Sequence, residues 1–115
     1  MAIVKTTDIG NRAEDVASQY LKRQGYKILA RNWRTRWCEI DVVTAKDQIV
    51  YFVEVKYRAN SQCGDGLEVI TSKKLKQMEF AARVWVSDND WPGDYRLMAI
   101  SVTGQPPIVQ TSVEL

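Results

Sequence analysis

Four charged side chains interrupt the segment CEIDVVTAKDQIVYFVEVKYR, residues 38–58, which otherwise has the pattern of two buried strands. Glu39 and Asp41 lie in the first apolar run, and Glu54 and Lys56 lie in the second. Directly opposite residues of neighbouring strands have Cβ atoms roughly 5 Å apart, which is close enough for two carboxylates to hold one divalent cation. Lys56 would offset part of the repulsion between the acids. These residue types therefore suit a metal site built on a hairpin.

The proposed pairing depends on which faces of the strands these side chains occupy. Side chains alternate along a strand, so Asp41 and Glu54 share a face only if the hairpin connection has an even number of residues. A four-residue loop over residues 46–49 would put Asp41 directly opposite Glu54, and a two-residue loop would put it diagonally adjacent. A three-residue loop would put the two acids on opposite faces. The turn AKDQ contains no glycine, which favours the longer, four-residue loop over a tight turn.

A solvated sheet face is the alternative explanation for Glu54 and Lys56, because charged residues are common on open faces of sheets. The preceding run IVYFV is apolar on both faces, however, which indicates a central strand covered on both sides. Glu14 adds another carboxylate, at the flank of the apolar face of an expected helix. Taken alone, such a boundary glutamate is more often solvated than functional.

The elements that must position these residues can be read from hydrophobic periodicity. Three- and four-residue spacing predicts helices over residues 8–25 and 71–89. Alternating or continuous apolar runs predict strands over 26–33, 38–45, 48–56, 94–102 and 107–115. The order α-β-β-β-α-β-β indicates an α/β sandwich with a mixed sheet, and the length of 115 residues indicates one domain over 1–115.

Composition narrows the chemistry available to the protein. The chain has no histidine, which excludes Ser-His and Cys-His nucleophilic catalysis and His-ligated zinc sites. Its two cysteines fit neither a zinc motif nor a disulfide framework. No signal-like or membrane-spanning run is present, so we expect a cytoplasmic protein. The net charge of +2 means that any nucleic-acid surface must be local.

The acid on the first helix, the motif EID and the motif FVEVKYR together resemble the PD-(D/E)xK nuclease superfamily. More closely, residues 10–58, including GYKILARNWR, resemble the uncharacterised bacterial YraN-like family, which is similar to archaeal Holliday-junction resolvases. The resemblance implies a restriction-endonuclease-like fold. It also implies that Asp41 and Glu54 are metal ligands, Lys56 is the catalytic lysine and Glu14 is an accessory ligand or base.

Three positions depart from that family pattern. Cys38 replaces the glycine before the Glu-Ile-Asp triplet, Ala13 replaces a glycine before the helix glutamate, and Met98 stands where an aspartate of the final sheet is typical. If the aspartate of the family supports the metal site, its replacement by Met98 would weaken that site. The remaining residues would support phosphodiester hydrolysis, with one or two Mg²⁺ or Mn²⁺ ions activating water and Lys56 stabilising the developing charge.

Two basic segments are candidates for contacts with nucleic acid. RNWRTRW places arginines, which suit phosphate, between Trp33 and Trp37, which suit stacking, although both tryptophans could equally be core. The second helix begins with lysines where the helix dipole disfavours cations, and an approaching phosphate would supply the missing anion. The predicted contact residues are Arg34, Arg36, Lys73, Lys74 and Lys76.

We therefore expect a metal-dependent endonuclease that acts on DNA, including branched, recombination or repair intermediates. A homodimer would suit two-strand cleavage by analogy with resolvases. Two alternatives stay open: a catalytically silent DNA-binding module of the same fold, and a structural or adaptor protein whose acids line a solvated face. Binding of a divalent ion distinguishes both alternatives from the nuclease.

Overall fold

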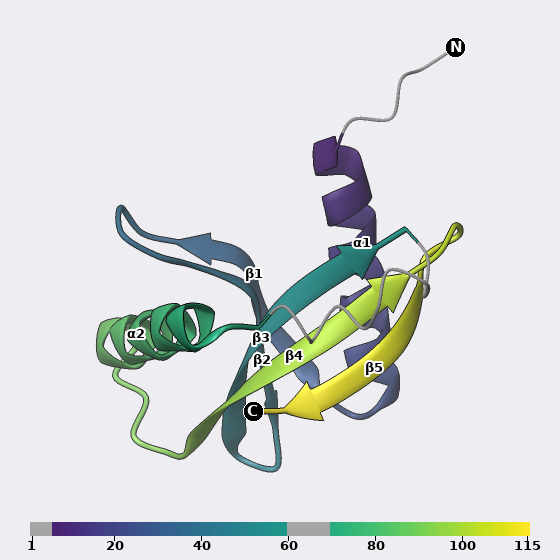
Figure 1. Ribbon diagram of the computed structural model, residues 1–115. Coiled ribbons are helices and arrows are strands. Elements are labelled where there is room, and N and C mark those ends of the chain that lie inside the picture. Colours follow the sequence, from purple (N-terminus) through teal and green to yellow (C-terminus); the bar gives the residue numbers. More distant parts are fainter. Residues whose placement is uncertain (1–5, 60–69) are drawn as a thin grey trace.

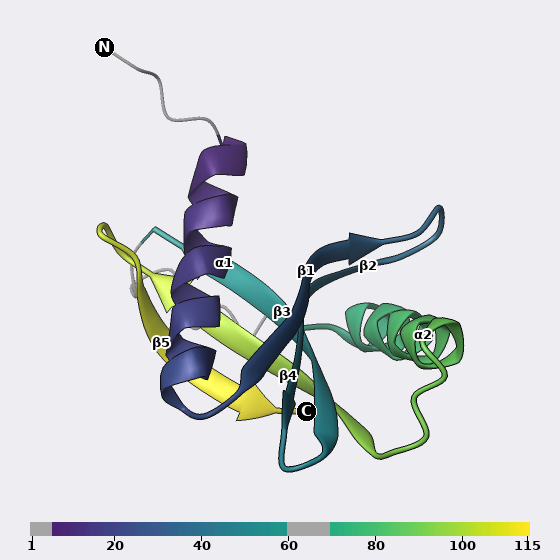
Figure 2. The same ribbon diagram turned by 180° about the vertical axis from the view of Figure 1, so that it is seen from behind.

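Two helices cover opposite faces of one five-stranded mixed sheet, which confirms the predicted fold class (Figures 1 and 2). The computed structural model describes residues 6–59 and 70–115. The strand order is β1-β2-β3-β4-β5, with β3 and β4 parallel and the other pairs antiparallel. Neither described helix is long and apolar enough to cross a bilayer. The elements are α1 (Thr6–Arg23), β1 (Lys27–Arg34), β2 (Glu39–Lys46), β3 (Ile49–Arg58), α2 (Ser72–Asp88), β4 (Tyr95–Thr103) and β5 (Ile108–Glu114).

Helix α1 buries one apolar stripe against the sheet. Ala13, Ala17 and Leu21 are all within 1% of complete burial and pack on residues of β2, β3 and β4. The helix ends where Gly25 adopts a positive φ of 92°, and the Tyr26 amide donates to the Leu21 carbonyl at 2.9 Å. This is the glycine-terminated cap that the sequence predicts. The packing of α1 on the sheet fixes the position of Glu14, which lies on the same helix.

Helix α2 packs on the other face of the sheet. The Thr71 hydroxyl caps its first turn by accepting from the Lys74 amide at 3.1 Å. Ala81, Ala82 and Trp85 are buried, and the Trp85 ring meets Phe52 of β3 edge-on at a centroid distance of 5.4 Å. This packing holds the first turn of α2, with its lysines, beside the outer half of β3.

The β2–β3 turn is tighter than the sequence predicts. Lys46 pairs with Ile49, which leaves Asp47 and Gln48 as the only turn residues, and both have positive φ values of 53° and 66°. These values are typical of a type I′ turn, which neither residue favours as glycine would. The prediction of a four-residue loop was wrong in its length. The register it implied holds as far as Val42 opposite Val53, where the ladder stops, one residue short of Asp41 and Glu54.

The β1–β2 pair bends away from β3 directly beyond this point (Figure 1). The β2–β3 ladder stops at Val42 and Val53, whereas β1 and β2 remain paired as far as Arg34 and Glu39. Val42 packs in the cluster under α1, but Ile40, of the same strand parity, packs in the cluster under α2. The bend therefore opens the sheet where the predicted acidic pair stands, and carries the β1–β2 turn towards α2.

Candidate metal and nucleic-acid site

Asp41 lies at the split between β2 and β3 and takes the place of a backbone partner. Its Oδ2 accepts a hydrogen bond from the Val55 amide at 2.8 Å, where the ladder between the strands has ended. Burial, and next the nearby charge of Glu54, raise the pKa of Asp41 from 3.8 to about 7, although the Val55 bond and the Lys74 ammonium act in the opposite direction. Asp41 therefore carries a proton that is released near neutral pH, which a divalent cation could displace.

Glu54 is held by two ammonium groups from different elements. Its Oε1 lies 3.0 Å from Nζ of Lys56, two residues along the same strand, and 3.2 Å from Nζ of Lys74 at the start of α2. The Glu54 side chain is only 12% exposed. The two lysines offset the charge of this largely buried acid. The predicted neighbourhood of Asp41, Glu54 and Lys56 is thus assembled.

Glu14 approaches from α1 with one oxygen unsatisfied. Among the described residues, its buried Oε2 has no hydrogen-bond partner, and the nearest cation is Nη2 of Arg31 at 3.8 Å. Burial raises the pKa of Glu14, and a hydrogen bond from Asn32 lowers it. The charge of Glu14 also raises the pKa of Asp41. Glu14 therefore contributes to the electrostatics of the site, and its unpaired oxygen would favour an added cation or proton.

The donor set suits Mg²⁺ or Mn²⁺ better than a metal that needs a full protein cage. Within residues 6–59 and 70–115, no group of three or more His, Cys, Asp or Glu side chains is close enough to hold an ion. Magnesium commonly binds through one or two carboxylates and completes its shell with water and substrate phosphate. Asp41 and Glu54 would be those two carboxylates, because each has oxygen lone pairs that its present partners do not use.

The predicted nucleic-acid residues divide into two neighbouring groups. Arg34 lies 3.8 Å from Glu39 and is 67% exposed, and the Arg36 guanidinium lies 5.7 Å from the centre of the Trp37 ring. Trp33 packs against the α2 cluster, whereas Trp37 is 75% exposed, so the two tryptophans have different surroundings. The second group is formed by three lysines of α2, of which Lys74 is turned towards Glu54: Lys73, Lys74 and Lys76.

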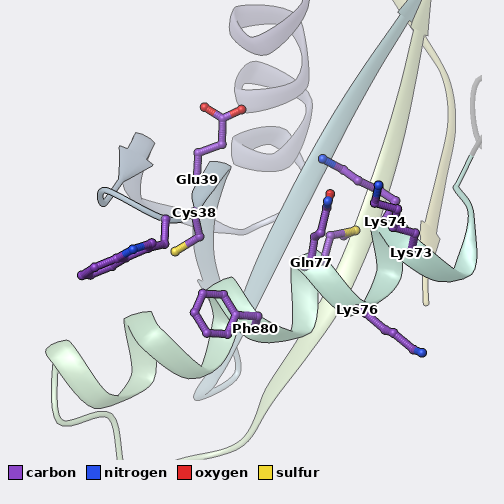
Figure 3. A pocket seen from close by; sticks show the side chains of 9 residues that line it. Cys38, Glu39, Lys73, Lys74, Lys76, Gln77 and Phe80 are labelled. Carbon is purple, nitrogen blue, oxygen red and sulfur yellow. The ribbon is translucent and has the colours of Figure 1, made fainter.

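A groove of about 650 Å³ lies between the end of the β1–β2 turn and α2 (Figure 3). We call it the α2 groove; it is lined by Trp37, Cys38, Glu39, Lys73, Lys74, Lys76, Gln77, Met78 and Phe80. Phe80 of α2 faces Cys38 across it, and the lysines lie together at the start of the helix (Figure 3). Sequence patterns did not predict the contact between Lys74 and Glu54 or the position of Phe80 in the groove. The lysines at an unfavourable helix end were the one available signal.

Comparison with known proteins identifies the family. The model of "Uncharacterised protein family UPF0102" matches residues 13–102. The chain belongs to the UPF0102 family. A UPF0102 protein of Vibrio parahaemolyticus is 38% identical over 89% of this chain and 86% of its own length. Another, from Chloroherpeton thalassium, is 45% identical over 81% of this chain and 73% of its own length. The YraN-like resemblance is thereby confirmed.

The three positions where this UPF0102 chain departs from the expected pattern lie in different surroundings. Ala13 is a residue of α1, is 1% exposed and belongs to the core cluster between α1 and the sheet. Cys38 closes the turn at the end of the β1–β2 arm, since the Thr35 amide donates to its carbonyl at 2.8 Å. Met98 pairs with Val53 and packs in the cluster under α1. Met98 therefore lies on the α1 face of the sheet, whereas the Glu54 carboxylate contacts Lys74 of α2.

Proposed function

We propose that this UPF0102 protein is a metal-dependent nuclease that hydrolyses phosphodiester bonds in DNA. The observation that supports the proposal is the meeting of Asp41, Glu54 and Lys56 at the split between β2 and β3. Two largely buried carboxylates beside one ammonium are costly for a fold to hold without a ligand. Their arrangement agrees with the roles that the nuclease resemblance implies.

Each residue of the site has a chemical task in this proposal. Asp41 and Glu54 would hold Mg²⁺ or Mn²⁺, which supplies Lewis-acid activation of the phosphate and lowers the pKa of a bound water. Lys56, 31% exposed and in contact with Glu54, would orient the attacking water and stabilise charge on the phosphoryl oxygens. Glu14, whose Oε2 has no hydrogen-bond partner among the described residues, would accept a proton or a hydrogen bond from water near the site.

The DNA would be held along the surface between the β1–β2 turn and α2. Arg34, Arg36, Lys73 and Lys76 are exposed there and would contact phosphates without reading sequence. A branched or processed DNA substrate and a homodimer for two-strand cleavage remain predictions of the resemblance. Cleavage of linear, nicked and branched DNA at matched concentration would rank these substrates.

A catalytically silent DNA-binding module is the second candidate. The observation that favours it is the double ion pair of Glu54 with Lys56 and Lys74, which already neutralises much of the acidic charge. A network of this kind can stabilise the contact between α2 and β3 with no metal present. The two candidates differ in whether the protein binds a divalent ion at all.

Asp41→Asn provides the decisive test, because it removes the charge and keeps the size of the side chain. The amide oxygen can still accept the bond from Val55, so the fold should persist. We expect calorimetry to show Mn²⁺ binding to the wild-type chain and none to this variant, with cleavage lost in parallel. Glu39→Gln is the matched control, since Glu39 lies on the same strand, exposed and paired with Arg34. A wild-type chain that binds no divalent ion would refute the nuclease.

A further inference from the structure

We propose that the α2 groove binds a single-stranded polynucleotide, with one base stacked on Trp37. The inference deepens the proposed function, on which it rests for the class of ligand. It adds that the substrate presents unpaired nucleotides next to the bond that is cut.

Two aromatic side chains of the groove are exposed to an extent that packing does not explain. Trp37 is 75% exposed and Phe80 is 43% exposed. They come from different elements, the β1–β2 turn and α2, and both line the same groove. Exposed aromatic surface of this size loses hydrophobic free energy unless a ligand covers it. Flat bases stack on such rings with little regard to sequence.

Trp37 has one interaction that prepares it for a base. The Arg36 guanidinium lies 5.7 Å from its ring centre, a cation–π contact, and still leaves the ring three-quarters exposed. Arg36 would then be close to the phosphate of a nucleotide whose base stacks on the ring. The bases of an intact duplex are paired and stacked internally, so only an unpaired nucleotide can use this surface.

The charge of the groove is complementary to a phosphate backbone. Lys73 and Lys76 are exposed at its α2 side, and among the described residues neither forms an ion pair. Among the described residues of the lining, Glu39 is the only acid, and it lies 3.8 Å from Arg34 and is thereby partly neutralised. The volume of about 650 Å³ is within the range of sites that enclose small ligands. A nucleotide with its phosphate is of that class.

Lys74 connects the groove to the acidic pair. The residue lines the groove, and its ammonium lies 3.2 Å from Oε1 of Glu54. A strand whose base occupies the groove would therefore have a neighbouring phosphate close to Asp41 and Glu54. The groove would select DNA with a single-stranded end, gap or branch and place the adjoining bond at the site.

The test measures binding in EDTA, where no cleavage can occur. Labelled twelve-nucleotide dT and U strands and a blunt duplex of the same length are titrated with the full chain, and anisotropy reports the dissociation constants. Trp37→Ala should weaken single-strand binding by roughly 5- to 150-fold, the range of one base–aromatic stack, and duplex binding far less. Trp37→Phe should restore most of the affinity. The dT and U arms show whether the groove accepts DNA, RNA or both.

Ile108→Ala serves as the control, because Ile108 is a 61% exposed apolar residue of β5, outside the groove lining. It should leave both affinities unchanged. Equal losses for single strand and duplex in Trp37→Ala, or no loss at all, would overturn the inference. A different oligomeric state of Trp37→Ala and the wild-type chain in sedimentation would also overturn it, since the groove would then be an interface between copies. If the wild-type chain shows no Mn²⁺-dependent cleavage but the binding pattern is as expected, the nuclease is refuted and the groove assignment is supported.

Discussion

The Lys74 ammonium lies 3.2 Å from Oε1 of Glu54, and so ties the first turn of α2 to the acidic end of β3. The two residues are far apart in the chain and meet only because α2 packs on the face of the sheet to which Glu54 points. Lys74 also lowers the pKa of Asp41. It therefore influences both carboxylates of the proposed metal site, from an element that carries none of the acids.

Lys74→Gln should increase the affinity for Mn²⁺. The ammonium competes with a cation for Glu54, and a partly exposed ion pair of this kind contributes up to about 1 kcal/mol, which corresponds to roughly fivefold in affinity. Calorimetry at pH 8, where Asp41 is ionised, measures the effect. Lys73→Gln, one residue earlier and exposed, should change it little. Weaker Mn²⁺ binding in Lys74→Gln would show that Lys74 orders the site instead of competing for it.

Lys56→Ala should separate metal binding from turnover. The substitution leaves Asp41, Glu54 and the second ammonium from Lys74 in place, so Mn²⁺ binding should persist. Removing one transition-state stabiliser commonly lowers the rate by about 10²- to 10³-fold. Single-turnover cleavage at saturating Mn²⁺ gives the comparison. Wild-type rates in this variant would remove Lys56 from the chemistry.

Stability should fall as the pH rises towards neutrality because of Asp41. Its pKa is 3.8 in the ordinary state and about 7 in the fold, so the folded chain binds the proton more tightly. The resulting stabilisation is complete below pH 3.8 and is lost as the pH passes 7. Asp41→Asn removes this loss and should be the more stable chain at pH 8, by an amount on the order of a few kcal/mol.

Urea unfolding of both chains at pH 4 and pH 8 checks the sign. The difference between them should be small at pH 4 and grow in favour of Asp41→Asn at pH 8. The raised pKa of Glu14 acts in the same direction in both chains. A constant difference across this range would mean that Asp41 is not destabilised by burial.

DNA affinity should depend steeply on salt and on the lysines of α2. A contact with Z phosphates gives a slope of about −0.9Z for duplex and about −0.7Z for single strands in a plot of log affinity against log salt. Replacing Lys73, Lys74 and Lys76 together by Gln should lower affinity for all sequences alike and flatten the slope. Filter binding at several salt concentrations measures both. A slope near zero in the wild-type chain would exclude this surface.

Gln48→Gly should stabilise the protein without changing the site. Gln48 has a φ of 66°, a left-handed conformation that costs a residue with a Cβ atom roughly 1–2 kcal/mol. Glycine removes this strain, although it adds freedom to the unfolded chain, so we expect a net gain of about 0.5–1 kcal/mol. Insertion of one residue after Asp47 is the informative contrast. It would shift the register and move Asp41 away from Glu54, with loss of Mn²⁺ binding.

The sequence was sufficient for the elements and for the acidic pair, because both follow from local periodicity. The five strands and two helices lie where the apolar spacing predicts them, within a few residues. Strand alternation was enough to bring Asp41 and Glu54 to the same end of the β2–β3 pair, where the charge of Glu54 raises the pKa of Asp41. The turn length was missed since Asp47 and Gln48 adopt positive φ without glycine, and only the cooperative pairing of both strands imposes that conformation.

Other features required the tertiary structure. The bend of β1 and β2 away from β3 has no local sequence signature, yet it decides that Trp37 reaches α2 and Trp33 packs in the core. Lys74 was predicted as a phosphate contact, and its approach to Glu54 depends on how α2 docks on the sheet. Docking of this kind is set by the summed packing of many side chains, which residue spacing alone does not encode.

The hydrogen bond from Val55 to Asp41 has a consequence for comparing relatives of this chain. Because Oδ2 replaces a backbone acceptor at the end of the β2–β3 ladder, position 41 has a folding reason to keep a short side chain with an acceptor oxygen. A lineage that gave up cleavage could exchange Asp41 for Asn and lose no structure, while an apolar residue would leave the Val55 amide unsatisfied. An aspartate at this position is therefore weak evidence for an active enzyme. Lys56 is no better indicator by itself, because its ion pair with Glu54 gives it a structural partner as well.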